Sequence, residues 1–106
     1  MKTSLSEMLG VEHSIIMAPM FLVTNVEMMI GALDNGITAA IPALNFRTDD
    51  DMRSALNEIK AHTSKPFGVN LIVNKSNIKL KKQLQTCLDL EVAFIITSLG
   101  NPEEII

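Results

Sequence analysis

The nine residues Pro66–Asn74, PFGVNLIVN, decide the fold of this chain. A run of β-formers and glycine, opened by a proline and closed by polar residues, predicts a buried strand. Because side chains alternate along a strand, Phe, Val, Leu and Val share one bulky face, and Gly68, Asn70 and Ile72 share the other. An unpaired buried polar group costs roughly 1–3 kcal/mol, so either the protein or a ligand must satisfy the amide of Asn70.

Three further apolar runs predict strands on either side of this one. The first is ended by Pro19 and the second by Pro42, which fits strand ends because proline cannot donate to a central ladder. The fourth, which has no proline, follows the third predicted helix. The runs expected as strands are 14–20, 37–41 and 92–96.

Amphipathic helices separate the strands. The segments Thr24–Glu27 and Thr48–Asp51 have the pattern of a capping box, and Ser76 or Asn77 is expected to cap the third helix. Each helix carries apolar residues at a helical spacing, which predicts one buried stripe. The stripes are Val26, Met29, Ile30 and Leu33; Met52, Ala55, Leu56 and Ile59; and Leu80, Leu84, Cys87 and Leu88.

The predicted order is β-α-β-α-β-α-β, and the residues Asn101–Glu104 predict the start of a fourth helix. This alternation predicts an α/β protein with parallel strands, as an open doubly wound sheet or as part of a (β/α)₈ TIM barrel. A complete barrel takes roughly 250 residues. We therefore interpret residues 1–106 as a single partial domain of about four strands and three to four helices, cut off inside its fourth helix.

Composition and charge limit the partners, the compartment and the metal sites that we expect. The net charge of −3, without a basic cluster, argues against nucleic acid and anionic membranes as partners. A single cysteine, Cys87, favours a reducing compartment, and the chain has no signal-peptide core, so we expect a cytoplasmic protein. The run Asp49–Asp51 is interpreted as helix capping and the methionines as core residues, so no metal site is expected.

Three motifs, in order, resemble a known family. Ile15–Met20 (IIMAPM), Asn35–Ile37 (NGI) and Lys65–Leu71 (KPFGVNL) are similar to the N-terminal portion of the nitronate monooxygenases, the 2-nitropropane dioxygenase-like flavoproteins. The resemblance covers nearly the whole chain. FMN-dependent enoyl-acyl-carrier-protein reductases share nearly the same two principal blocks, so both activities stay open.

The resemblance implies the first half of an FMN-binding (β/α)₈ barrel that, when intact, oxidises small alkyl nitronates with O₂. It implies that Ala18 and Met20 line the flavin, mostly through backbone atoms, and that Asn70 hydrogen-bonds the isoalloxazine edge. The family's catalytic histidine and glycine-rich phosphate loop belong to the second half of the barrel. No catalytic residue is therefore assigned here, and the chain alone is expected to be inactive.

The chain also departs from the family pattern, with Met17 in place of glutamine and Ser14 in place of proline. Beyond the fourth strand, the segment 97–100 could line a pocket rim or form an ordinary loop. His13 and His62 are interpreted as surface residues at element ends. A rival of a different class is a non-catalytic half-barrel that associates with itself through its two unpaired edge strands.

Overall fold

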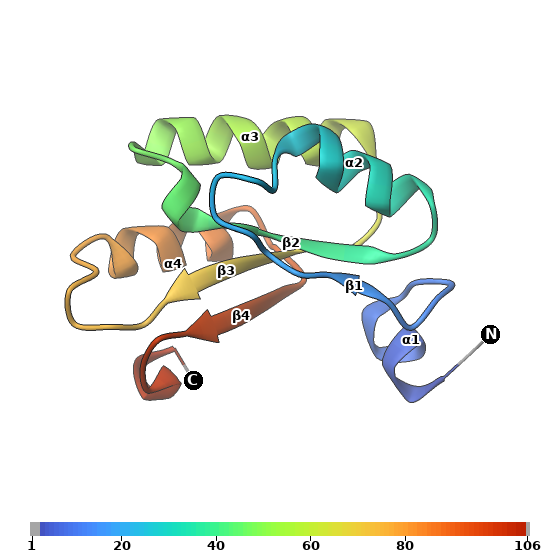
Figure 1. The fold of residues 1–106 in the computed structure, drawn as a ribbon. Helices are drawn as coiled ribbons and strands as arrows, with labels where there is room; N and C mark the ends of the chain where they lie inside the picture. The colour runs from blue at the N-terminus through green and yellow to red at the C-terminus, as the bar shows by residue number, and fades with distance from the viewer. Residues whose placement is uncertain (1–2, 106) are drawn as a thin grey trace.

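A four-stranded parallel sheet forms the centre of the computed structural model, which describes residues 3–105 (Figure 1). Its strands are β1 (Ile16–Met17), β2 (Thr38–Pro42), β3 (Gly68–Ile72) and β4 (Phe94–Ser98), and they lie side by side in that order. Each neighbouring pair is parallel. The predicted fold class is confirmed, because parallel strands joined in sequence by helices form half of a (β/α)₈ barrel.

The helices connect consecutive strands, and α2, α3 and α4 pack their apolar faces against one side of the sheet. Their buried residues merge with alternate residues of β2 and β3 into one hydrophobic core, which includes Cys87. None of the helices within residues 3–105 is long and apolar enough to cross a membrane. The helices are α1 (Ser4–Leu9), α2 (Val26–Asp34), α3 (Asp49–His62) and α4 (Leu80–Asp89), with 3₁₀ turns η1 (Ala43–Asn45) and η2 (Pro102–Glu104).

The start of α2 differs from the predicted capping box at Thr24–Glu27. The capping residue is Asn25, whose side-chain oxygen accepts from the backbone N–H of Met28 at 2.9 Å. Thr24 is buried, and its hydroxyl instead accepts from the backbone N–H of Met20 at 2.8 Å. The capping-box prediction is therefore wrong here, because Thr24 closes the turn that precedes the helix.

Thr48 caps α3 as predicted, since its hydroxyl accepts from the N–H of Asp51 at 3.1 Å. The other half of the predicted capping box, from the Asp51 carboxylate to the N–H of Thr48, does not form within residues 3–105. The buried residues of this helix are those of the predicted stripe. Three acidic residues occupy its first turn, where they complement the positive end of the helix dipole.

Helix α4 begins at Leu80, later than the capping residues expected from sequence. Asn77 instead donates from its side-chain amide to a backbone carbonyl of β3, at 2.8 Å, and to the side chain of Gln83, at 3.0 Å. Such side-chain hydrogen bonds compete with helix formation and hold the preceding residues in turns. The buried face consequently includes Gln83, whereas Leu88 is 62% exposed, so its expected burial is wrong.

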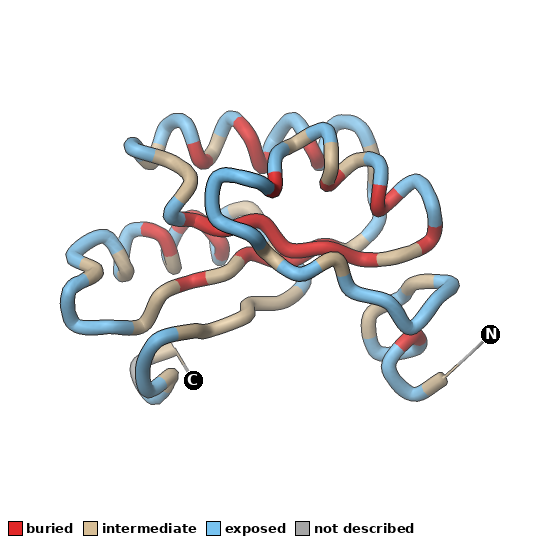
Figure 2. The backbone as a smooth tube through the Cα atoms, in the orientation of Figure 1, coloured by how far each residue is buried: buried red, intermediate tan, exposed pale blue. Residues whose placement is uncertain are grey.

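The first strand is much shorter and more exposed than the predicted segment 14–20. Only Ile16 and Met17 are in strand conformation, and Ile15 is 55% exposed. The reason is the position of β1 at the edge of the sheet, where it pairs with β2 on one side. Figure 2 shows the chain around β1 as exposed or intermediate.

The remaining elements shift by one or two residues. Strand β2 runs to Pro42 and is buried throughout, and β4 is displaced towards the C-terminus relative to the predicted 92–96. Thr97 and Ser98 are therefore strand residues rather than loop residues. The predicted fourth helix is a 3₁₀ turn in the described chain, with Asn101 accepting from the N–H of Glu103 at 3.1 Å.

Candidate functional site

The candidate site lies on the sheet face that the helices do not cover, near the carboxyl ends of the strands. Residues paired in register in a parallel sheet point to the same side, and the core residues Ile41, Val69 and Leu71 mark the helix-covered side. The intervening positions therefore form the opposite face. These are Ala40 and Pro42 of β2, Gly68, Asn70 and Ile72 of β3, and Phe94, Ile96 and Ser98 of β4.

Asn70 occupies the middle of this face and is half-buried. Its side-chain nitrogen donates to the backbone carbonyl of Ile96 at 2.9 Å and to the hydroxyl of Ser98 at 3.2 Å. The protein thus satisfies part of the hydrogen bonding that the sequence analysis requires for the Asn70 amide. The amide oxygen makes no hydrogen bond within residues 3–105, so the Asn70–Ser98 pair offers both an acceptor and a hydroxyl donor to a ligand.

Ala18 and Met20 follow β1 at the same end of the sheet, and both are exposed. The backbone N–H of Met20 is bonded to Thr24, and its carbonyl accepts from the N–H groups of Val23 and Thr24. The backbone of Met20 is thus engaged within its own turn, which leaves its 41%-exposed side chain to contact a ligand. Met17, at the position where the family has glutamine, is in register with Ala39 and packs against the core.

Sequence reasoning did not single out Asn45, which holds the loop after β1. Its side-chain oxygen accepts from the N–H of Leu22 at 2.7 Å, and its nitrogen donates to the carbonyl of Thr24 at 2.8 Å. Leu22 has a φ of 60°, a left-handed conformation that this clamp stabilises. The loop presents an apolar surface formed by Met20, Phe21, Leu22 and Val23. No local pattern in the sequence identifies a contact over 23 residues.

The two histidines lie away from this face. His13 is next to Glu12, with 3.8 Å between the side-chain nitrogen and oxygen, and His62 ends α3 with its ring 3.3 Å from Asp34. Within residues 3–105, no three His, Cys, Asp or Glu side chains gather in a way that could hold a metal ion.

Cys87 is buried in the core, and burial raises the pKa of its thiol to about 11. Because the thiolate is the reactive form, we expect the folded protein to react with an aromatic disulfide reagent at least about tenfold more slowly than the unfolded protein. Labelling with and without denaturant near neutral pH measures this ratio. Equal rates in both states would contradict the buried position.

Parallel strands with helices on one side and a buried to half-buried inner face on the other define a segment of a parallel βα barrel, and comparisons with solved structures agree. FabK from Thermotoga maritima matches the whole chain with a TM-score of 0.89 and 26% identity, and the match covers 33% of that protein. The enoyl reductase domain of MlnA from Bacillus amyloliquefaciens matches 91% of this chain with a TM-score of 0.80; at 21% identity that likeness concerns the fold alone.

Two curated proteins are similar in sequence, and both are named (3aS,4S,5R,7aS)-5-hydroxy-7a-methyl-1-oxo-octahydro-1H-indene-4-carboxyl-CoA dehydrogenase. The Mycobacterium tuberculosis protein is 34% identical over 71 residues, which are 67% of this chain and 20% of the relative. The Rhodococcus jostii protein is 29% identical over 77 residues, which are 73% of this chain and 22% of the relative. The chain thus spans about a fifth of these relatives. No protein-family model matches it.

Proposed function

We propose that this chain is the N-terminal half-barrel of an FMN-dependent oxidoreductase. The observation that carries the proposal is the position of Asn70 on the inner face of the parallel sheet. The whole of this chain is similar in fold to one third of FabK. Barrel enzymes bind substrates and cofactors at the carboxyl ends of their strands. Ala18 and Met20 follow β1 at that end, and Asn70, in the middle of β3, reaches Ser98 at the end of β4. In this proposal the three residues contact the flavin.

The residues present fit one edge of a flavin. An isoalloxazine edge carries both N–H and C=O groups, and the free oxygen of Asn70 with the hydroxyl of Ser98 are complementary to such a pair. The exposed side chain of Met20 and the small Ala18 suit an apolar ring surface. Bound FMN would supply the redox chemistry, while these residues would orient the ring and exclude water from it.

Two activities are consistent with the motifs, and the comparisons favour one of them. Both curated relatives are named as a carboxyl-CoA dehydrogenase, which supports redox chemistry on an acyl thioester. Nitronate oxidation with O₂ is the second candidate, supported by the PFGVNL motif at Pro66–Leu71. In the intact enzyme, enoyl-thioester-dependent oxidation of a reduced nicotinamide would identify the first, and nitronate-dependent O₂ uptake the second.

Titration with FMN tests the proposed contact. We expect saturable quenching of flavin fluorescence by the chain and about fivefold weaker binding for Asn70→Ala, because one hydrogen bond contributes about 1 kcal/mol. Asn57→Ala is the matched control, since Asn57 is exposed on α3. Equal FMN affinity of Asn70→Ala and the unchanged chain would show that Asn70 does not contact the flavin. If binding does not saturate below about 100 μM FMN, this chain does not form a flavin half-site.

A non-catalytic half-barrel that self-associates is the alternative of a different class. It is favoured by the partly exposed edge strand β1 and by β4, whose five residues are all half-buried. Two four-stranded sheets joined edge to edge would supply the eight strands of a barrel. Light scattering across a concentration series tests this, and a monomer at all concentrations would exclude it.

A further inference from the structure

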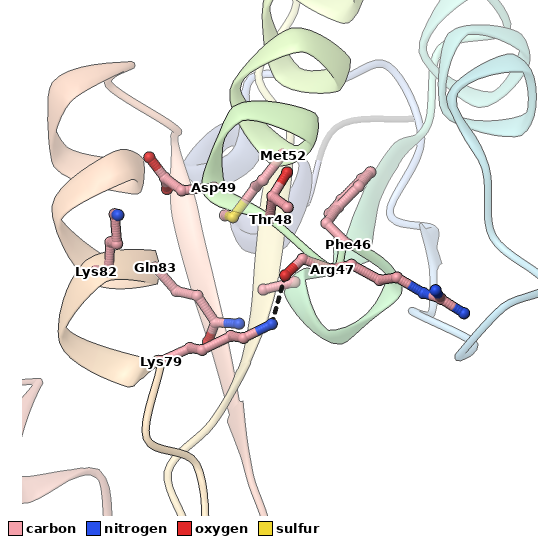
Figure 3. A pocket seen from close by; sticks show the side chains of 9 residues that line it. Phe46, Arg47, Thr48, Asp49, Met52, Lys79, Lys82 and Gln83 are labelled. Carbon is pink, nitrogen blue, oxygen red and sulfur yellow. Dashed lines mark hydrogen bonds between the residues drawn. The ribbon is translucent and has the colours of Figure 1, made fainter.

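A cavity of about 320 Å³ lies between the N-terminal ends of α3 and α4 (Figure 3). It is on the helix-covered side of the sheet and is therefore separate from the face that carries Asn70. Phe46 and Met52 provide apolar lining, and Lys79, Lys82 and Gln83 bring polar groups from the start of α4. A volume near 300 Å³ is sufficient for a small organic ligand.

Gln83 is the most informative group in this cavity, because it is only 7% exposed. Its side-chain oxygen accepts from the amide of Asn77 at 3.0 Å, and Asn77 is itself fixed by the carbonyl of Ile72 at 2.8 Å. This chain of hydrogen bonds orients the nitrogen of Gln83 towards the cavity, near the amine of Lys79 (Figure 3). Within residues 3–105 that nitrogen donates to no acceptor, and because no fully buried side-chain nitrogen or oxygen there lacks a partner, it is open to the cavity and free to donate to a ligand.

The two lysines add positive charge next to this donor. The amine of Lys79 is anchored by the carbonyl oxygen of Arg47, which keeps it at the cavity. Lys82 lies about one helical turn further along α4 and lines the same cavity. The guanidinium of Arg47 points away from the cavity in Figure 3, so its charge lies outside the proposed site.

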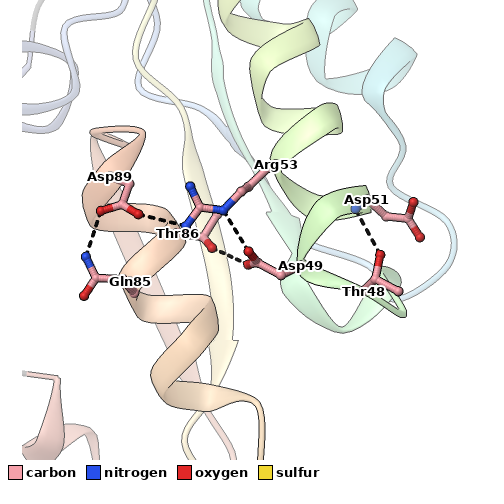
Figure 4. Close-up of polar contacts among 7 residues, drawn as sticks. All are labelled: Thr48, Asp49, Asp51, Arg53, Gln85, Thr86 and Asp89. Carbon is pink, nitrogen blue, oxygen red and sulfur yellow. Dashed lines mark hydrogen bonds and ion pairs between the residues drawn. The ribbon is translucent and has the colours of Figure 1, made fainter.

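Asp49 also lines the cavity, and its negative charge is partly compensated by Arg53, which it shares with Asp89. Its carboxylate accepts from the hydroxyl of Thr86 and from Arg53 at 2.7 Å (Figure 4). These two contacts, the Thr86 hydrogen bond first, hold the pKa of Asp49 below its usual range. Even with Asp49 counted in full, the two lysines leave an excess of one positive charge among these lining groups.

We propose that this cavity binds a phosphate group. The oriented Gln83 amide and the Lys79 amine would donate to phosphate oxygens, Lys82 would add charge, and Phe46 and Met52 would contact an organic part of the ligand. Charged acceptors make the strongest hydrogen bonds with such donors, which is why an anion is favoured over a neutral ligand. This inference is independent of the proposed oxidoreductase function, since it uses none of the residues on the inner face.

Titration of the full chain with phenyl phosphate, followed by two-dimensional NMR, tests the proposal. We expect saturable shifts centred on the side-chain amide of Gln83 and the backbone amides of α4's first turn. Lys79→Met and Gln83→Glu should each weaken binding at least about fivefold, because each removes a donor to a charged group. Gln83→Glu retains the oxygen that accepts from Asn77.

Lys81→Met is the matched control, because Lys81 is exposed on the same helix and does not line the cavity. It should leave the affinity within about twofold. Inorganic phosphate binding as tightly as phenyl phosphate would identify free phosphate as the ligand, and tighter phenyl phosphate would identify an organic phosphate. Shifts scattered over the surface, equal weakening by Lys81→Met, or equal binding of phenol would each overturn the proposal. The shift map of the unchanged chain decides the matter even if a variant does not fold.

Discussion

Replacement of Gly68 by alanine is expected to destabilise the protein by about 1–3 kcal/mol, as overpacking of a filled site typically does. A Cβ at Gly68 would lie 2.3 Å from the nearest ring atom of Phe94, far inside van der Waals contact. The two residues are partners in the β3–β4 register, so the ring covers the glycine on the inner face. Urea unfolding followed by circular dichroism measures the loss.

Gly31→Ala is the control for this substitution. Gly31 lies inside α2, and a Cβ there would meet no atom within 4 Å. Alanine at that position should stabilise the helix by roughly 0.5–1 kcal/mol, because glycine loses more conformational freedom on folding. Opposite signs for the two Gly→Ala substitutions would attribute the loss at Gly68 to the Phe94 ring. An unchanged stability of Gly68→Ala would show that the ring can move aside without loss.

The order of strands and helices could be predicted from the sequence because its signals are local. The segment Pro66–Asn74 fixes both the strand and its two faces, and the structure buries Val69 and Leu71 while leaving Asn70 on the other side. The cap at Thr48 is equally local, since it needs only the residue three positions later. The expectation that Ala18, Met20 and Asn70 form a site came instead from the family resemblance, since short-range patterns show only that the amide of Asn70 needs a partner.

The failures of prediction have tertiary causes. The run at 14–20 has the composition of a buried strand, but its exposure depends on whether another element covers β1. Thr24 has the sequence signature of a cap, yet Asn45 and Met20 bind this turn and move the cap to Asn25. Propensity sets what a segment can form, and contacts with distant segments decide where it begins.

The phosphate-site candidate also could not be foreseen from the sequence. Its residues come from the segment between β2 and α3, from α3 and from the start of α4, and the contacts that shape it join positions more than 30 residues apart, as between Asp49 and Thr86. The hydrogen bond from Asn77 to Gln83 is nearer in sequence, but its meaning depends on Gln83 being buried. The sequence alone does not show that a polar residue in the middle of a helix, such as Gln83, is buried.

Replacement of Asp49 by alanine is the second substitution that we expect to reduce stability strongly. The hydroxyl of Thr86 is fully buried and donates to Asp49, so Asp49→Ala should cost about 1–3 kcal/mol, the penalty of an unsatisfied buried donor. The substitution also frees Arg53, which bridges Asp49 and Asp89 across α3 and α4 at 2.7 and 2.8 Å. Asp50→Ala is the matched control, because Asp50 occupies the same helical turn and is exposed.

The same contacts give stability a defined dependence on pH. Donation from Thr86 and Arg53 lowers the pKa of Asp49, and donation from Arg53 and Gln85 lowers that of Asp89. A carboxyl group with a lowered folded-state pKa stabilises the fold above its unfolded value, near 3.8, and this contribution disappears as the pH falls through the lower folded value. Asp49→Asn should therefore flatten the decline in unfolding free energy below about pH 4, whereas Asp50→Asn should leave the decline steep. Parallel curves for Asp49→Asn and the unchanged chain would show that the charge of Asp49 does not hold α3 and α4 together.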